Sequence, residues 1–410
     1  MEKPKTNHTE FDVALRVLPF PDQLTTIGRA IVKLTYTIDP NGGALRPTTT
    51  PVALVNDIED DSLEPRLPPH SDFWPAKRLA DIAVIGSAFA RDGKPVADRL
   101  VELTIGGWRK VIRVHGTREL SVGRGGKVSI RKAEPYTEMP LGIEHAYGGL
   151  DGRVKFDWNN LDEVTPIAIK ADWPGLYPRN PWGRGYLCVN DPVKELTMPS
   201  QEDPEQPLTA DTLIVDPEHW FQRPMPAYFD WTPINCFPRN LFYTIQCDPW
   251  FPPPQDERLQ EIRDKVLPPD YRELLKDQLF GSTPHWRFMQ ESAPLQCFGQ
   301  KALLNAPISV NGMHPEHDEL KFTLPPPPEL MLAFETERQS PIPRLTSVEL
   351  HPAKLTVSVT YTSEIAAPRM FLPSVHPEIP FGVVVNGSKP VWFDTPPTIK
   401  SVVKAAETET

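Results

Sequence analysis

Proline is the residue that most limits what this chain can fold into. The sequence has 50 prolines among 410 residues, more than twice the average usage of about 5%. They are spread over the whole length rather than collected in one linker. Because proline has no backbone N–H and fixes φ, it interrupts helices and sheet ladders. We therefore expect short strands, ordered loops and few helices.

Composition and charge narrow the class of protein. Hydrophobic residues make up 39% of the chain, enough to bury a core. The formal net charge of −11 argues against general binding to nucleic acid or to an anionic membrane surface, and it favours a partner with a basic surface. The sequence has no apolar run long enough for a membrane span and no apolar N-terminal signal segment. We expect a cytoplasmic globular protein without membrane insertion.

The cysteines give no sign of a disulfide framework or a metal site. The chain has four of them, Cys188, Cys236, Cys247 and Cys297. They form no C-x-x-C pair and show no regular spacing, which favours reduced structural thiols.

The clearest secondary-structure signal is a hairpin whose turn is Gly106-Gly107. With these glycines in the turn, Ile105 faces Trp108 and the ribbon has one apolar side. That side consists of Val101, Leu103, Ile105, Trp108, Ile112 and Val114, with Lys110 as its only polar member. The apolar run from Asp81 to Ala90 predicts a third strand upstream. We expect the three strands to form a meander.

Further strands and one helical region complete the expected fold. Strands are predicted at Phe11 to Leu18, Arg29 to Thr37, Leu320 to Leu324, Ser347 to Leu350 and Leu355 to Tyr361, with a final hairpin from Phe381 to Phe393 around Asn386-Gly387. Gln255 to Phe280 has helical periodicity and is divided by Pro268-Pro269. The pattern predicts a mainly β protein, with packed antiparallel sheets in a sandwich-like arrangement and a small helical hairpin.

The expected domain organisation follows composition. Residues 1–200 are predicted as a β-rich N-terminal domain and 201–330 as a segment rich in proline and aromatic residues that carries the helical hairpin. Residues 331–410 are expected to form a C-terminal β extension, and its polar end, Lys400 to Thr410, is expected to be frayed.

Three glycine-bearing runs are expected to be turns or ordered loops. Gly123 to Lys127 resembles a phosphate-binding loop, but the spacing is wrong and Val128 replaces the Ser or Thr that would bind magnesium. We therefore predict a turn there. The runs Glu138 to Asp151 and Asn180 to Tyr186 are predicted to be loops packed by their own side chains.

The stretch from Trp220 to Phe251 is rich in aromatic residues and proline. Such residues can line a core, stack on sugar rings or cover a partner's apolar surface, and core burial is the commonest of these roles. The candidate partner-binding residues in this stretch are Trp220, Tyr228, Trp231, Phe237 and Arg239.

The run from His314 to Glu319 concentrates two imidazoles and three carboxylates. Zinc accepts such ligands, but the two histidines stand three residues apart with Pro315 between them, which does not suit the helical H-E-x-x-H geometry. We predict a polar turn that leads into the Leu320 strand. The sequence shows no nucleophile elbow and no reactive-cysteine context, so we assign no catalytic, cofactor or metal residue.

Several short motifs occur in an order that resembles a known family. They are Asp72-Phe-Trp-Pro-Ala-Lys77, Asp81-Ile-Ala-Val-Ile-Gly86, Ile105-Gly-Gly-Trp-Arg-Lys110, Met139-Pro-Leu141, Glu144-His-Ala-Tyr-Gly-Gly149, Asn180-Pro-Trp-Gly-Arg-Gly185 and Gly312-Met-His-Pro-Glu-His-Asp-Glu-Leu320. Taken together they resemble the domain of unknown function 2169 family, which is associated with bacterial type VI secretion loci. The resemblance covers roughly Phe20 to Pro325.

This resemblance implies a non-enzymatic adaptor or chaperone. Such a protein binds a secreted effector toxin, often one with a spike-tip domain, and loads it onto the spike protein of the secretion machine. The resemblance implies no catalytic residue and no cofactor. Two other functions stay open from the residues: a carbohydrate-binding β-domain protein, suggested by the ten tryptophans, and a metal-dependent hydrolase that uses the His314 cluster.

Overall fold

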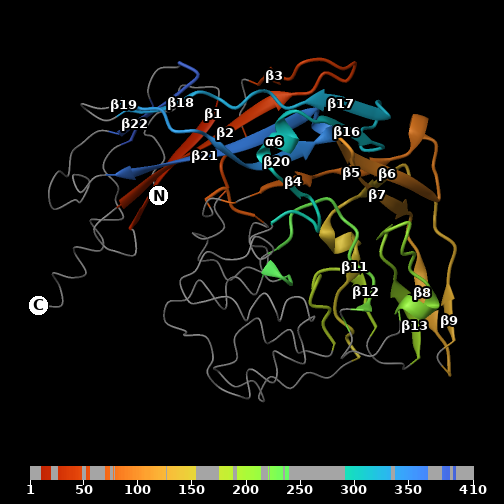
Figure 1. Ribbon diagram of the computed structural model, residues 1–410. Coiled ribbons are helices and arrows are strands. Elements are labelled where there is room, and N and C mark those ends of the chain that lie inside the picture. Colours follow the sequence, from red (N-terminus) through yellow and green to blue (C-terminus); the bar gives the residue numbers. More distant parts are fainter. Residues whose placement is uncertain are drawn as a thin grey trace, which may run out of the picture.

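The computed structural model shows a mainly β protein built from several sheets (Figure 1). The structure describes residues 11–19, 26–48, 52–55, 70–73, 77, 79–125, 127–153, 175–187, 192–213, 220, 222–233, 236–239, 291–333, 338–367, 381–387 and 391–393. Within these ranges no helix is long and apolar enough to cross a membrane. The predicted helical hairpin at Gln255 to Phe280 and the predicted frayed end lie outside them.

The largest sheet has the strand order β1-β2-β21-β20-β4-β15, and β3 pairs with β2. Its strands are β1 (Phe11–Pro19), β2 (Thr26–Thr37), β3 (Arg46–Pro47), β4 (Ala80–Val84), β15 (Cys297–Phe298), β20 (Arg344–His351) and β21 (Thr356–Ala367). All pairs are antiparallel except β20 with β4. Strands from all three expected domains therefore pair within one sheet.

A second sheet, of five strands, contains the predicted hairpin. Its order is β14-β7-β6-β16-β17, with β6 (Asp98–Ile105), β7 (Trp108–His115), β14 (Gln201–Glu202), β16 (Pro307–Asn311) and β17 (Glu319–Thr323). The expected register is confirmed, since Ile105 pairs with Trp108. The apolar side of the ribbon is buried except for Trp108 and Lys110, which are half-buried, and Trp108 meets Phe298 edge to face at 5.0 Å.

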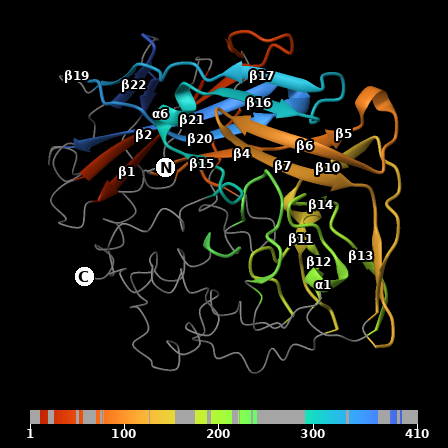
Figure 2. The same ribbon diagram turned by 45° about the vertical axis from the view of Figure 1, so that its right-hand side comes forward.

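The two large sheets share one hydrophobic core. Val32, Ile82 and Val359 from the first sheet belong to the same buried cluster as Leu103 and Ile308 from the second. Both sheets lie in the upper part of the molecule in Figures 1 and 2. This arrangement confirms the prediction of a mainly β protein with packed antiparallel sheets.

Four smaller sheets complete the described part of the fold. They consist of β5 (Ser87–Phe89) with β10 (Glu138–Pro140); β11 (Tyr147–Gly148) with β12 (Arg184–Gly185); β8 (Glu119–Val122) with β9 (Val128–Ile130) and β13 (Val193–Thr197); and β18 (Leu330–Ala333) with β19 (Arg338–Gln339), β22 (Phe381–Val385) and β23 (Val391–Phe393). Helical turns in the described part are α1 (Ala210–Leu213), α6 (Gln300–Leu304), η1 (Arg91–Gly93), η2 (Ile143–His145) and η6 (Pro352–Lys354).

The predicted meander is wrong. β4 lies between β20 and β15 in the large sheet, whereas β5 pairs with β10, so neither strand pairs with β6. The run is split at Ile85 and Gly86, whose backbone groups bond to Leu350 and Leu141 respectively. Every residue of β4 is buried, because a continuous apolar run suits a strand covered on both faces.

The turn predictions are confirmed. The run from Gly123 to Lys127 joins β8 to β9, and the Gly123 N–H donates to the Lys127 carbonyl oxygen at 2.8 Å. Asn386 and Gly387 both have positive φ at the end of β22, and β23 is an edge strand.

Candidate functional site

The five candidate partner-binding residues lie inside the molecule. Trp220, Tyr228, Trp231, Phe237 and Arg239 are each between 1% and 6% exposed. The described backbone of this stretch borders β4 of the large sheet, where the Val84 N–H donates to the Phe229 carbonyl oxygen at 2.9 Å. In this arrangement the side chains line the interior and do not form the exposed aromatic surface expected of a docking site.

A cluster of four buried charges ties this stretch to the large sheet. Lys77, just before β4, donates to Asp81 at 2.6 Å and also to Glu291. Arg239 donates to the other oxygen of Glu291 at 2.9 Å. Ser292 donates its hydroxyl to Asp81 at 2.8 Å. We call Lys77, Asp81, Arg239 and Glu291 the buried charge cluster.

The buried charge cluster is neutral as a whole. Its two cations and two carboxylates are each less than 10% exposed. Burial alone would lower the pKa of Lys77, but the carboxylates of Asp81 and Glu291 outweigh that effect and raise it. Burial raises the pKa of Glu291, and the cations of Lys77 and Arg239 oppose that shift.

A second group of buried polar residues lies on the same face of the large sheet, where Lys33 stands in register with Thr360, Ser347 and Asp81. Lys33 of β2 donates to Asp72 at 3.1 Å, and the Thr360 hydroxyl donates to the same carboxylate at 2.9 Å. Nearby, the Trp231 indole N–H donates to Glu349 at 3.1 Å. Burial acts to raise the pKa of Glu349, but a hydrogen bond from His351 and the charge of Lys33 lower it to about 2. Asp72 and Lys77 stand at the two ends of one sequence motif. Each therefore belongs to a different buried network.

The two predicted loops Glu138 to Asp151 and Asn180 to Tyr186 cross each other at close range. Within them β11 pairs in parallel with β12. The Asn180 side chain donates to the carbonyl oxygens of Ile143 and Tyr147 at 2.9 and 3.1 Å. The Gly149 N–H donates to the Asn180 carbonyl oxygen at 2.8 Å. The two glycine-bearing loops are therefore bonded to each other where they cross. We call this arrangement the loop crossing.

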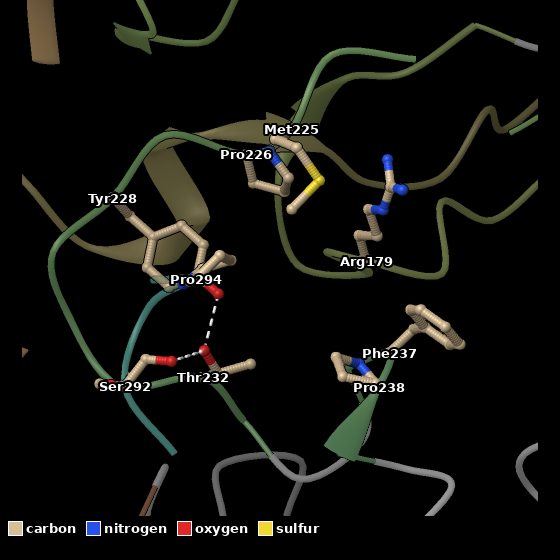
Figure 3. A pocket seen from close by; sticks show the side chains of 9 residues that line it. All are labelled: Arg179, Met225, Pro226, Tyr228, Thr232, Phe237, Pro238, Ser292 and Pro294. Carbon is tan, nitrogen blue, oxygen red and sulfur yellow. Dashed lines mark hydrogen bonds between the residues drawn. The ribbon is translucent and has the colours of Figure 1, made fainter. Parts of the chain in front are cut away.

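A hollow of about 90 Å³ opens beside the aromatic stretch (Figure 3). Its apolar lining consists of Met225, Pro226, Tyr228, Phe237, Pro238 and Pro294. On one side the Tyr228 hydroxyl and the Thr232 hydroxyl lie 2.7 Å apart, and Thr232 donates to the Ser292 carbonyl oxygen at 2.9 Å. Arg179 stands across the hollow from these groups (Figure 3). The hydroxyls of Tyr228 and Thr232 therefore have hydrogen-bond partners within the wall of the hollow. The Arg179 guanidinium gives the lining a positive charge.

Lys110 is the polar exception on the apolar side of the hairpin. Its ammonium group donates to the Gln296 side-chain oxygen at 2.6 Å and to the Pro294 carbonyl oxygen at 3.4 Å, and it faces the rings of Tyr228 and Phe229. Burial lowers its pKa to about 7, and the charge of Asp203 opposes this shift. None of the described carboxylates forms an ion pair with this ammonium group.

Replacing Lys110 by Met should change the pH dependence of stability. The unfolded chain holds this proton up to a pKa of about 10.5, whereas the folded chain releases it near pH 7, so the wild-type free energy of unfolding rises with pH between these values. The Met variant lacks that rise. Its free energy of unfolding relative to wild type should therefore be highest near pH 7 and decline toward pH 10, as measured by urea unfolding.

The exposed Lys321 provides a control for this experiment. Its ammonium group pairs with Glu319 on the surface of β17, and the side chain is 66% exposed. Replacing Lys321 by Met should leave the difference from wild type constant with pH over this range. A constant difference for the Lys110 variant would contradict the assignment.

The run from His314 to Glu319 is the predicted polar turn between β16 and β17. His314 Nδ1 accepts hydrogen bonds from the backbone N–H groups of Glu316 and His317, both at 3.0 Å. Among the described residues, no three His, Cys, Asp or Glu side chains form a group suited to a metal ion. Two of the four cysteines, Cys236 and Cys297, are described and both are free, and burial raises the pKa of each to about 12.

A comparison with models of protein families shows which family this chain belongs to. The model of the family described as "Uncharacterized protein conserved in bacteria (DUF2169)" matches residues 25–362. The chain belongs to this family. The match contains the buried charge cluster, the loop crossing and the residues that line the hollow. No curated protein and no solved structure matches the chain.

Sequence reasoning missed the buried charge cluster and the role of Lys110. Lys77 and Asp81 are four residues apart in a region expected to enter a strand, and Glu291 is 214 residues farther along the chain than Lys77. The available signal was the presence of Asp81 at the start of an apolar run. A charge there needs a buried partner, but the sequence does not say which residue supplies it.

Proposed function

We propose that this protein is a non-enzymatic bacterial adaptor that acts in the cytoplasm. It binds an effector toxin of a type VI secretion system and loads it onto the spike protein. The observation that carries the proposal is family membership over residues 25–362, since this range contains the ordered motifs that resemble the adaptor family.

The arrangement of charges supports a binding role. The charges of the motif residues Lys77 and Asp81 are paired within the buried charge cluster, which also contains Arg239 and Glu291. Catalysis by general acids and bases needs such groups near a site that substrate can reach. In this chain they instead fix the loops that border the hollow, because Arg239 and Glu291 belong to the segments that contain Phe237 and Ser292.

The physical demands of toxin handling also support the proposal. An effector segment that seats on a spike has apolar surface that would aggregate in water, so its holder must cover that surface and later release it. Proline fixes a backbone before binding and so lowers the entropy cost of ordering a loop. Pro226, Pro238 and Pro294 provide such fixed backbone around the hollow.

Co-expression with the toxin encoded near this gene should give a complex that co-elutes in size-exclusion chromatography. Deleting this gene should leave the toxin unstable or unsecreted, because its apolar segment is then uncovered. Immunoblots of cells and culture medium measure both effects. Restoring the wild-type gene should restore export. If the toxin stays stable, soluble and exported at normal levels in the deletion strain, the adaptor function is wrong.

A further inference from the structure

We infer that the hollow beside Arg179 is a docking site for an extended protein segment in which an aliphatic side chain stands next to a carboxylate. This inference deepens the proposed adaptor function by naming the surface and the chemistry of the bound segment. The aliphatic side chain enters the hollow, and the carboxylate pairs with Arg179.

The size and lining of the hollow select the side chain. Its volume is about 90 Å³, smaller than the roughly 150 Å³ of an apolar cavity that holds benzene. A branched aliphatic side chain therefore fits better than an aromatic ring. The hydroxyls of Tyr228 and Thr232 already form hydrogen bonds within the wall. An apolar side chain that enters the hollow therefore leaves neither hydroxyl without a partner.

Arg179 supplies charge complementarity for an acidic neighbour. Its Nη1 donates to the Arg223 carbonyl oxygen at 3.3 Å and lies 3.5 Å from the Tyr177 hydroxyl, and the guanidinium covers the Trp220 ring at 5.3 Å. Within the described residues no carboxylate forms an ion pair with it. Stacking on Trp220 fixes its direction, and a fixed guanidinium binds a carboxylate well.

The rim of the hollow exposes apolar side chains that a partner would cover. Met225 is 39% exposed, and Leu295, which follows the lining residue Pro294, is 74% exposed. Leu295 has a φ of 67°, which is strained for a bulky residue. Gln296 holds this turn by donating to the carbonyl oxygens of Ile82 and Phe229, both at 2.9 Å. The fold thus presents an apolar side chain to solvent beside the hollow in a strained backbone conformation.

Peptide titration of the intact protein tests the site directly. The probes are acetyl-Gly-Leu-Asp-Gly-amide and its Asn counterpart, and the reporter is the carbon-13-labelled methyl group of Met225, one of eight methionines in the chain. The Asp peptide should shift this resonance, with roughly fivefold higher affinity than the Asn peptide for a partly exposed charged hydrogen bond. Met225→Leu assigns the signal. An unmoved Met225 resonance, or equal affinity for both peptides, overturns the inference.

Charge reversal provides a readout that a structural role of Arg179 would not produce. Arg179→Glu should lose the preference for the Asp peptide and prefer acetyl-Gly-Leu-Lys-Gly-amide instead. Arg344→Glu, at an exposed position outside the hollow, should keep the wild-type preference. If Arg179→Glu keeps the wild-type preference while its thermal unfolding is unchanged, Arg179 does not bind the carboxylate and the inference fails.

The toxin complex separates this inference from the proposed function. Arg179→Glu and the hollow-filling variant Met225→Trp should each weaken co-elution with the toxin about fivefold or more, and Arg344→Glu should not. Co-elution that both hollow variants leave intact overturns the docking site but leaves the adaptor function standing. A wild-type protein that binds the Asp peptide but never the toxin refutes the adaptor function and leaves the peptide site standing.

Discussion

Replacing Lys77 by Met is expected to lower the free energy of unfolding by about 3–5 kcal/mol, because it leaves Asp81 and Glu291 buried without their shared cation. The methionine fills a similar volume, so lost charge rather than lost packing should dominate. Arg239 still neutralises Glu291, but Asp81 keeps only hydrogen-bond donors such as Ser292. Urea unfolding followed by tryptophan fluorescence measures the change.

The control is the exposed Lys321→Met, whose surface pair with Glu319 should contribute less than about 1 kcal/mol. A double variant sharpens the test. Adding Glu291→Gln to Lys77→Met removes one of the stranded carboxylates, so the double variant should be more stable than the sum of the two single effects by about 1 kcal/mol or more. Strictly additive effects, or a loss below that of the control, would show that these residues do not act as a network.

Local patterns explain why much of the fold could be predicted. The β6–β7 hairpin depends on Gly106-Gly107 and on side chains that alternate over a few residues, so its register can be read directly. The turns at Gly123 and Asn386 are equally local. The position of β4 is different. It pairs in parallel with β20, whose residues lie more than 250 positions farther along the chain, and no periodicity within Asp81 to Ala90 specifies that partner.

The candidate site was harder to predict for the same reason. Aromatic residues in the stretch after Trp220 are visible in the sequence, but burial depends on what covers them. The side chain of Trp231 bonds to Glu349 of β20, and Tyr228 packs with Ile143 and Ala293. These partners come from distant segments. Likewise, the hollow exists only where Arg179, Met225 and Pro294 meet, and each belongs to a loop whose path the sequence does not specify.

The loop crossing predicts the second large effect. Replacing Gly149 by Ala should lower the free energy of unfolding by roughly 3–5 kcal/mol, since overpacking and a left-handed backbone both add cost. The new Cβ would lie 2.3 Å from the Gly183 carbonyl oxygen, and Gly149 has a φ of +96°. The neighbouring backbone cannot move away freely, because the Arg184 N–H is bonded to Ala146 and the Tyr186 N–H to Gly148.

Gly152→Ala is the matched control, because a Cβ there meets no atom within 4 Å, and its effect should be within about 0.5 kcal/mol. The crossing also connects to the hollow. Ile143 and Ala146 pack with Tyr228, which lines it, so a displaced crossing shifts that wall. Gly149→Ala should therefore weaken co-elution with the toxin even below its unfolding temperature, whereas Gly152→Ala should not. A Gly149 variant with wild-type stability and a wild-type complex would mean that the crossing neither stabilises the fold nor positions the docking surface.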